Sequence, residues 1–283
     1  MKCLNTYFSK KLNQEIDYEF LKLQYINGKS LRQIENEYGI GRAALSRHLK
    51  QDGVKILGNG VGNERRYLLK CNDNFFETID NQDKAYCVGF FLADGSFLPN
   101  GIKFDQTEKD KEILEYINKC LNGEQTIKTY SARVISDPYN SERTYVSQPM
   151  CRIAYSHIKL KEDLKKLGIQ ENKTYNFCKI NIPEEYWNDF MRGFLDGDGS
   201  ITKSKNSFSI NYTIKNPALV DFIIDCSKPY YQFNKHYDSR SNCYKIEIQS
   251  ISEAQKFKYF VYHTNFSFCL KRKLKVLNKI LGN

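Results

Sequence analysis

The sequence predicts an α+β protein in two parts: an all-α N-terminal domain and a larger domain made of two copies of one α+β unit. Two observations lead to this fold class. Residues 18–53 carry the apolar spacing of three short helices. The stretch at 86–96 returns at 190–200 with the same apolar run and the same Asp-Gly-Ser ending, which indicates an internal repeat. The expected divisions are a domain at 1–55, a linker at 56–83, and two halves at 84–183 and 184–283.

Composition and charge narrow the classes of function. The 283 residues are 41% hydrophobic, which is typical of a globular protein, and carry a formal net charge of +10. This charge fits either a soluble basic protein or one that binds a polyanion. No stretch is long and apolar enough to cross a membrane, and the N-terminus lacks the apolar core of a signal peptide. The nine cysteines follow no zinc or disulfide spacing, which fits a reducing cytoplasm.

The N-terminal stretch predicts three helices in order. The first ends at Gly28, and the second begins after Ser30, with Gln33 three residues later in the pattern of a capping box. Gly39 supplies the turn before a third helix over 42–50. The residues expected to face inward are Phe20, Leu21, Leu23 and Ile26 in the first helix, and Ala44, Leu45 and Leu49 in the third.

A glycine turn before the last of three short helices is the arrangement of a helix-turn-helix. The stretch GKSLRQIENEYGIGRAALSRHLK (28–50) resembles bacterial helix-turn-helix domains. In that arrangement the third helix enters the major groove of DNA, and its outward side chains reach base edges. A plain three-helix domain with a basic, solvated face is the alternative. The outward residues are Arg42, Ser46, Arg47 and Lys50.

Residues 56–83 differ from the helical stretch before them. Three glycines fall between 58 and 62, and Arg65 and Arg66 follow. This composition predicts a flexible linker that can follow a phosphate backbone.

The two copies align 104 residues apart (198 − 94), so that Gly89 matches Gly193 and Asp94 matches Asp198. The similarity continues without a gap between 103–117 and 209–223. Each copy predicts a helix that is apolar on nearly all sides and therefore buried. A glycine inside a helix costs about 1 kcal/mol, which the close approach of another backbone would explain. We therefore expect the two helices to pack glycine against glycine.

In that packing, Asp94 and Asp198 would lie side by side at the ends of the two helices. Two like charges repel each other, and a negative charge is also unfavourable at the negative end of a helix dipole. A divalent cation would reverse this effect, and carboxylates, water and phosphate are the ligands that Mg²⁺ prefers. A simple helix stop explains one Asp-Gly-Ser, but two on a repeated frame predict a site for Mg²⁺ or Mn²⁺.

The paired motifs resemble those of the LAGLIDADG homing endonucleases in their single-chain form, over about residues 80–283. The resemblance implies two α-β-β-α-β-β-α units related by a pseudo-twofold axis, with antiparallel sheets that form a saddle over DNA. It also implies that the last motif acid of each half, Asp94 or Asp198, holds metal at a scissile phosphate. An earlier motif acid is present as Asp196 and is replaced by Leu92 in the first half.

The resemblance implies three further site residues. A basic residue lies near each cut site in the family, and the aligned positions here are Lys173 and Lys271. A lysine in that place can stabilise the charge that develops on a phosphate under attack. A glutamine after the first long strand orders solvent in the family; this is Gln106, which aligns with Tyr212 in the second half.

Polar and apolar residues alternate over 205–213, which predicts a strand with one face on helices and one face outward. A hairpin follows over 235–250, and the first half carries a longer hairpin over 124–156. Two-stranded ribbons with mixed polar side chains suit readout of the major groove, and a merely solvated sheet face is the alternative. The expected DNA contacts are Lys205, Ser207, Ser209, Asn211, Lys235, Arg240 and Lys245.

These observations predict a site-specific homing endonuclease that acts as a monomer in intron homing. It would make a metal-dependent double-strand break in a long, asymmetric DNA target, with metal activating water and stabilising the leaving 3′ oxygen. Two alternatives stay open: an intron RNA-splicing maturase on the same fold, and a regulator that binds DNA without cutting. We expect no membrane association and a cytoplasmic, DNA-associated location in a bacterial or phage-type context.

Overall fold

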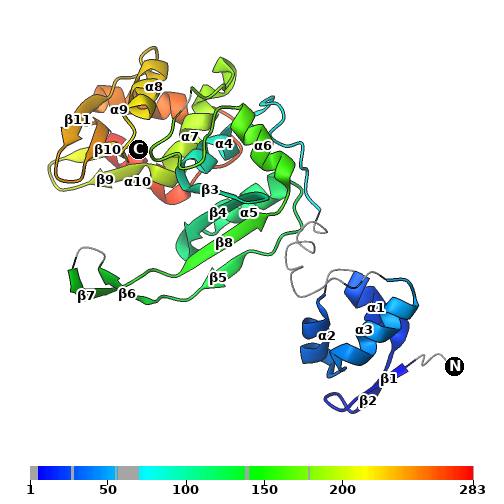
Figure 1. Cartoon of the computed structure of the whole chain (residues 1–283). Coiled ribbons are helices and arrows are strands. Elements are labelled where there is room, and N and C mark those ends of the chain that lie inside the picture. Colours follow the sequence, from blue (N-terminus) through cyan, green and yellow to red (C-terminus); the bar gives the residue numbers. More distant parts are fainter. Residues whose placement is uncertain are drawn as a thin grey trace. The chain divides into compact units, whose positions relative to one another are not determined.

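A computed structural model describes residues 6–26, 29–54, 56, 70–137, 140–177 and 179–282 (Figure 1). The chain divides into two compact units, residues 1–69 and residues 70–283. Among the described residues, no helix has the length and apolar character needed to cross a membrane.

The N-terminal unit begins with a β-hairpin that the sequence analysis did not predict. Strands β1 (Thr6–Ser9) and β2 (Gln14–Asp17) pair antiparallel, and Asn13 adopts a left-handed conformation (φ 51°) between them. The Ser9 hydroxyl donates to the carbonyl of Tyr38 at 2.5 Å, which ties the hairpin to the helices. The expectation of an all-α domain is therefore wrong, because aromatic and β-branched residues in this stretch favour a strand pair.

Three helices complete this unit: α1 (Tyr18–Ile26), α2 (Leu31–Tyr38) and α3 (Arg42–Gln51). The predicted capping box of α2 is confirmed. The Ser30 hydroxyl accepts a hydrogen bond from the Gln33 amide (3.0 Å), and the Gln33 side chain accepts one from the Ser30 amide (2.7 Å). Gly39 ends α2 with a φ of 67°, the left-handed conformation that favours glycine.

The buried face of α1 differs from the predicted one. Tyr18, Leu21 and Tyr25 are buried, and their spacing of three and four residues keeps them on one side of the helix. The Tyr18 ring stacks on His48 of α3, with centroids 3.6 Å apart. The remaining apolar residues of α1 are exposed: Phe20, Leu23 and Ile26.

The second unit contains two stretches with the same general order of elements: a helix, two strands, a helix, further strands and a closing helix. The first stretch comprises α4 (Gln82–Asp94), β3 (Gly95–Leu98), β4 (Gly101–Thr107), a 3₁₀ turn (Glu108–Asp110), α5 (Glu112–Cys120), β5 (Lys128–Tyr130), β6 (Val134–Asp137), β7 (Asn140–Val146), β8 (Met150–Tyr155) and α6 (Ile158–Lys166).

The second stretch comprises a 3₁₀ turn (Glu184–Tyr186), α7 (Trp187–Asp198), β9 (Ser200–Lys203), β10 (Phe208–Ile214), α8 (Pro217–Ser227), β11 (Asn234–Asp238), β12 (Cys243–Ile248), α9 (Ile251–Val261) and α10 (Lys271–Leu281).

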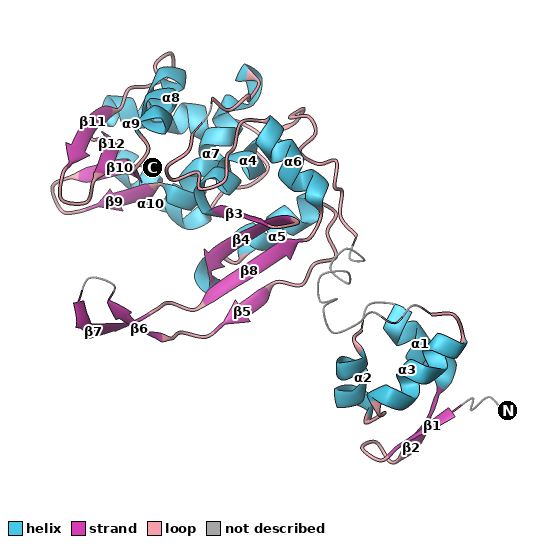
Figure 2. Cartoon of the chain, in the orientation of Figure 1, coloured by secondary structure: helices cyan, strands magenta, loops and turns pink. Residues whose placement is uncertain are grey.

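Two antiparallel four-stranded sheets, ordered β3-β4-β8-β5 and β11-β12-β10-β9, organise this unit (Figure 2). Ile102, Phe104, Ile210 and Tyr212 alternate along β4 and β10 and are buried against helices on one side of each sheet. We call the opposite side of each sheet its outer face. The first sheet continues into the ribbon β6–β7, so the predicted long hairpin is confirmed over its described residues; 138 and 139, in its predicted loop, lie outside them.

The predicted linker is shorter than expected at its C-terminal end. Phe75, Phe76 and Ile79 are buried in the main core of the second unit, so residues 70–83 belong to that unit. The glycines at 58 to 62 led us to extend the predicted linker over these apolar side chains. The predicted glycines at 58 to 62, and Arg65 and Arg66, lie outside the described residues.

Candidate active site between two helix ends

Helices α4 and α7 pack along each other (Figure 1). A Cβ atom added to Gly89 would lie 2.0 Å from the carbonyl oxygen of Phe190, and one added to Gly193 would lie 2.0 Å from that of Tyr86. The predicted close approach of the two glycines to the opposite backbone is therefore confirmed. The contacts are reciprocal, because Tyr86 and Phe190 are separated by the same 104 residues as the glycines (190 − 86).

Asp94 is the last residue of α4, and Asp198 is the last residue of α7. A Cβ added to Gly197 would lie 3.3 Å from Asp94 Oδ2, so the end of α7 reaches the Asp94 carboxylate. Burial, and then the nearby charge of Asp198, raise the pKa of Asp94 to about 6. Burial by the surrounding protein also raises the pKa of Asp198, although its side chain reaches solvent.

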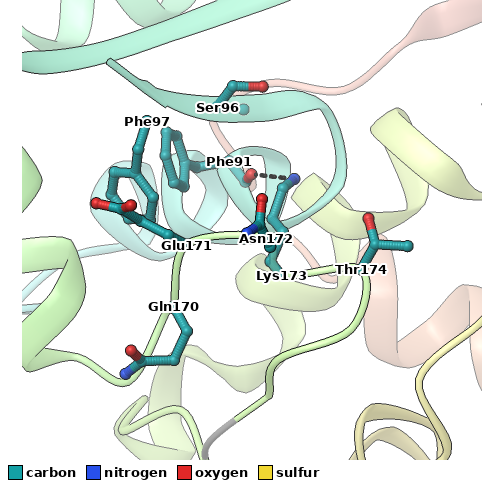
Figure 3. A pocket seen from close by; sticks show the side chains of 9 residues that line it. Phe91, Ser96, Phe97, Gln170, Glu171, Asn172, Lys173 and Thr174 are labelled. Carbon is teal, nitrogen blue, oxygen red and sulfur yellow. Dashed lines mark hydrogen bonds between the residues drawn. The ribbon is translucent and has the colours of Figure 1, made fainter. Parts of the chain in front are cut away.

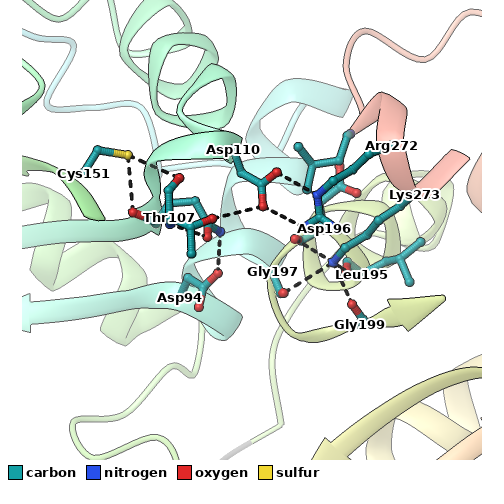
Figure 4. A network of polar contacts seen from close by, with 12 residues as sticks. Asp94, Thr107, Asp110, Cys151, Leu195, Asp196, Gly197, Gly199, Arg272 and Lys273 are labelled. Carbon is teal, nitrogen blue, oxygen red and sulfur yellow. Dashed lines mark hydrogen bonds and ion pairs between the residues drawn. The ribbon is translucent and has the colours of Figure 1, made fainter. Parts of the chain in front are cut away.

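A lysine closes the end of each helix; Lys273 is buried and Lys173 is partly buried. Lys173 Nζ donates to the carbonyls of Phe91 (2.8 Å) and Ala93 (2.5 Å) and to that of the residue between them. Lys273 Nζ does the same for α7, donating to Leu195 (2.6 Å), Asp196 (2.9 Å) and Gly199 (2.6 Å) (Figure 4). A cation is favoured at the negative end of a helix dipole. Burial lowers the pKa of each lysine to about 8.

The structure corrects the choice of lysine in the second half. Lys271 is exposed on the first turn of α10, and Lys273 occupies the place that Lys173 has in the first half. Residues two positions apart point to nearly opposite sides of a helix. Lys273 shares the buried face of α10 with Leu277 and Ile280 at helical spacing, and this periodicity was the signal that could have identified it.

Gln106 lies beside Asp94, as the resemblance implies. Its side-chain nitrogen donates to Asp94 Oδ2 at 2.9 Å, and its oxygen accepts from the Thr107 amide at 2.7 Å, which fixes its orientation. The aligned Tyr212 is buried and stacks on Phe194, with ring centroids 5.0 Å apart. The surroundings of the two carboxylates therefore differ.

A second polar network joins the two stretches near this site. Arg272 of α10 donates through Nε to Asp110 Oδ1 (2.7 Å) and through Nη2 to Asp110 Oδ2 (2.6 Å) (Figure 4). Asp110 is the last residue of the 3₁₀ turn after β4, and the Thr107 hydroxyl also donates to it. The bidentate pair holds the start of α10, and with it Lys273, against the first stretch.

Asp196 is buried between the paired helices. Its Oδ2 accepts hydrogen bonds from the Tyr86 hydroxyl (2.9 Å) and the Leu270 amide (2.8 Å). Burial raises the pKa of Asp196 to about 6. The positions 104 residues away are Phe190 and Leu92, which are both apolar. The equivalent pair, Leu92 and Phe190, therefore has neither the acid nor the hydroxyl of the pair formed by Asp196 and Tyr86.

A pocket of about 300 Å³ opens next to Lys173 (Figure 3). The rings of Phe91 and Phe97 form one side, and the loop that carries Lys173 forms the other. The Lys173 ammonium thus lies at the border between the helix end and an open space. The pocket lining comprises Phe91, Gly95, Ser96, Phe97, Gln170, Glu171, Asn172, Lys173 and Thr174.

The donors at the two helix ends fit a divalent cation. Both side chains supply carboxylate oxygens, the hard ligands that Mg²⁺ and Mn²⁺ take. Asp198 accepts no hydrogen bond within the described chain, and a nearby cation would favour the ionised form of both acids. In the same described ranges, no three His, Cys, Asp or Glu side chains gather into one group. Water and substrate would therefore complete the coordination.

The outer face of the second sheet carries part of the predicted DNA-binding set. Cross-strand pairing places Asn211 opposite Glu247 and Thr213 opposite Lys245, so Ser209, Asn211 and Lys245 share this face. Arg240 lies in the turn between β11 and β12 and is exposed. His236, which the sequence analysis did not select, pairs across the strands with Lys245 and faces outward.

Three predicted contacts lie elsewhere. Lys235 pairs with the inward Ile246 and donates to Asp221 of α8 at 2.6 Å, so it belongs to the helix-covered side. Alternation along a strand puts neighbouring residues on opposite faces, and a start shifted by one residue exchanges them. Lys205 and Ser207 lie in the turn before β10, because the strand begins at Phe208.

In the N-terminal unit, Leu45 and Leu49 of α3 are buried as predicted, whereas Ala44 is exposed. The predicted base-reading side chains lie on the solvent side of α3, and Arg42 Nε is 2.6 Å from Glu35 Oε2 of α2. Ser46 is half-buried, and the other three residues are exposed: Arg42, Arg47 and Lys50.

Comparison with known proteins shows the fold. The homing endonuclease I-WcaI bound to its DNA recognition sequence superposes with a TM-score of 0.51 at 12% identity, over 81% of this chain and 97% of that one. I-DmoI in complex with DNA and Mn gives 0.41 at 13% identity, over 65% and 98%. The I-LtrWI LAGLIDADG homing endonuclease bound to target DNA gives 0.44 at 13% identity, over 72% and 91%.

In sequence, a DNA polymerase from Methanocaldococcus jannaschii is 25% identical over 239 residues, which cover 76% of this chain. The match spans only 14% of the length of the polymerase. No protein-family model matches the chain. The mixed fold with antiparallel sheets is therefore shared with a homing endonuclease, at low sequence identity.

Proposed function

We propose that this chain is a site-specific endonuclease that uses Asp94 and Asp198 to cut both strands of duplex DNA. One observation carries the proposal: the two carboxylates end a pair of closely packed helices, and a lysine caps the end of each helix. The shared fold with I-WcaI, a homing endonuclease bound to its DNA recognition sequence, supports this reading. So does the motif resemblance at 86–96 and 190–200.

Asp94 and Asp198 would hold Mg²⁺ or Mn²⁺, and the bound metal would supply an activated water and positive charge at the scissile phosphates. Gln106 fixes the rotation of the Asp94 carboxylate through its 2.9 Å hydrogen bond. Lys173 and Lys273 place a positive charge beside each carboxylate, which favours a phosphodiester that gains negative charge during attack. With pKa values of about 8, both lysines are largely protonated at neutral pH.

In this proposal the sheets position DNA over the site. The edge strand β3 begins directly after Asp94, and the edge strand β9 begins two residues after Asp198, so each sheet extends outward from one carboxylate. Ser209, Asn211 and Lys245 on the outer face would contact bases in the major groove. We also propose that residues 1–55 bind DNA as a helix-turn-helix through α3.

Both carboxylates belong to one chain, so we propose a monomer on an asymmetric target. The test is selection of cleaved sites from a random duplex library by the full chain in Mg²⁺. The expected result is one family of asymmetric sites, cut on both strands, with one chain per duplex by sedimentation. Sites that are bound specifically but remain uncut would favour a regulator, and a preference for structured RNA would favour a maturase.

A further inference from the structure

A carboxylate lies at the centre of the outer face of the first sheet. Asp105 on β4 accepts a hydrogen bond from Lys103 Nζ at 2.6 Å. Across the strands it pairs with Arg152 on β8, whose Nε and Nη2 (3.2 Å) both donate to it. The Arg152 guanidinium also lies over the ring of Tyr130, 5.5 Å from its centroid. One acid therefore holds two cations in fixed positions.

The outer face of the second sheet has a similar centre. Glu247 on β12 is only 5% exposed and lies 2.5 Å from Lys245 Nζ. It also accepts a hydrogen bond from the Ser209 hydroxyl at 3.0 Å, and His236 Nε2 lies 3.4 Å away. Asn211 donates to Ser209 at 2.9 Å, which extends the network along β10.

The two acids occupy the same cross-strand pair on opposite strands. Asp105 of β4 faces Arg152 of β8, and Asn211 of β10 faces Glu247 of β12. The sequence alignment matches residues 103–117 with 209–223, which brings Asp105 onto Asn211. Each outer face thus places one carboxylate at this central pair, although the residue that provides it differs.

Such acids oppose simple affinity for a polyanion. Each one cancels a positive charge on a surface that would meet phosphates, and it occupies cations that would otherwise release counterions from DNA. Hydrogen bonds from Arg152 and Lys103 lower the pKa of Asp105 despite its burial, and those from Lys245 and Ser209 do the same for Glu247. Both acids are therefore ionised at neutral pH, and their presence requires a reason other than binding strength.

We propose that Asp105 and Glu247 are positioning residues that set the sequence specificity of this chain at the expense of its general affinity for DNA. The inference rests on the proposed function. Each acid holds its cations in one orientation, in which they donate to particular base edges rather than to any phosphate. The carboxylates also repel a backbone that approaches in the wrong register, and repulsion against the wrong partner is one source of specificity.

The test compares Asp105→Asn and Glu247→Gln with the wild-type chain on a selected target and on an unrelated duplex, without divalent metal. We expect tighter binding to the unrelated duplex, with a salt slope steeper by about one for each cation released to phosphate. The ratio of specific to non-specific affinity should fall by about tenfold, the size of one lost base-specific contact. The relaxed base pairs in a selection should be those under the altered sheet.

Asp221→Asn is the matched control, because it removes the same charge and releases Lys235 on the helix-covered side of the same sheet. Glu247→Asp is the second variant, which keeps the charge but shortens its reach. It should lose specificity without gaining affinity for the unrelated duplex. Circular dichroism checks that each variant is folded.

Two results would overturn the inference: an unchanged affinity ratio in folded Asp105→Asn and Glu247→Gln, or the same change in Asp221→Asn. A wild-type chain that distinguishes the selected target from the unrelated duplex but never cuts either one would refute the proposed nuclease function alone. A wild-type chain with no preference for any duplex would refute both.

Discussion

Lys173 and Lys273 direct their ammonium groups at backbone carbonyls, in a part of the structure that also contains two carboxylates. Lys173 donates to three carbonyls and Lys273 to four at the end of a helix, where the backbone has no further amide to offer. The lowered pKa of each lysine shows that burial outweighs the attraction of the nearby acids. At the scale of single residues, these lysines therefore serve both the helix ends and the charge of the site.

Lys273→Met should lower the free energy of unfolding by about 2 kcal/mol or more, because buried carbonyls lose their donor. It should also reduce cleavage of a selected target. Lys271→Met, two residues away and exposed, is the matched control and should change stability by less than about 0.5 kcal/mol. Urea unfolding of both variants measures the difference. Equal effects would assign the role to the basic run as a whole.

Asp94→Asn and Asp198→Asn should each abolish double-strand cleavage while specific binding is retained, because in the proposed function the sheets and the N-terminal unit would provide the affinity. Cleavage in Mg²⁺ and binding without metal are measured on one target. Two variants that still cut both strands would show that these acids are not the metal ligands.

For Asp94→Asn we also expect an effect of pH on the free energy of unfolding. The pKa of Asp94 is about 6 in the folded chain and about 4 when unfolded, so the folded state holds this proton more tightly. The stabilisation from protonation is lost as pH rises through this window. Asp94→Asn should remove that loss and raise the free energy of unfolding at pH 7 by on the order of 1 kcal/mol. Thermal melts without metal, at about pH 4.5 and about pH 7, would compare the wild-type chain with Asp94→Asn below and above the folded pKa of Asp94.

At the scale of elements, the α4–α7 pair sets the distance between the two helix ends. Its backbone contacts leave no room for even a methyl group at Gly89 or Gly193. Gly89→Ala should therefore lower the free energy of unfolding by more than about 4 kcal/mol, or prevent folding. Gly41→Ala is the control, because no atom lies within 4 Å of the added Cβ, and it should cost less than about 1 kcal/mol. A mild effect of Gly89→Ala would mean that the helices can separate.

The same helix pair contains a buried polar contact, in which Tyr86 donates to Asp196. Tyr86→Phe removes a hydrogen bond that favours the ionised acid, so it should raise the pKa of Asp196 further above its present value of about 6. The loss of stability, about 1 to 3 kcal/mol, should be full at pH 8 and should shrink below the folded pKa as the acid is protonated in both proteins. Guanidinium unfolding at the two pH values checks the sign.

At the scale of the whole molecule, the chain consists of two compact units with separate cores. If each unit binds DNA, the footprint should have two parts. Removal of residues 1–55 should weaken binding and shorten protection at one end, while cleavage by the second unit remains possible. Footprints of the full and shortened chains on one target test this. Identical footprints would remove the N-terminal unit from DNA recognition.

Local patterns in the sequence were enough for several of these features. The capping box at Ser30 and the helix ends at Asp94 and Asp198 each depend on residues within one or two turns. Such patterns are reliable because hydrogen bonds and side-chain spacing within a helix involve only near neighbours in the chain. The close packing at Gly89 and Gly193 was predicted from the repeat, although it is a contact between distant segments. The hairpin at 6–17 was missed: its aromatic and β-branched residues favour strands, and its bonds to α2 and α3 tie it to the helices.

The sequence by itself thus determined the repeat, its two glycines and its two terminal acids. Tertiary structure decided which lysine closes α7, which side of β11 faces α8, and which residues donate hydrogen bonds to Asp196. Lys273, Asp221 and Tyr86 all act on residues far away in the chain. Periodicity tells which side chains share a face, but only the packing of distant segments determines which face is covered. The hydrogen bonds that these distant partners make depend on the packing, so the roles of the residues follow from it.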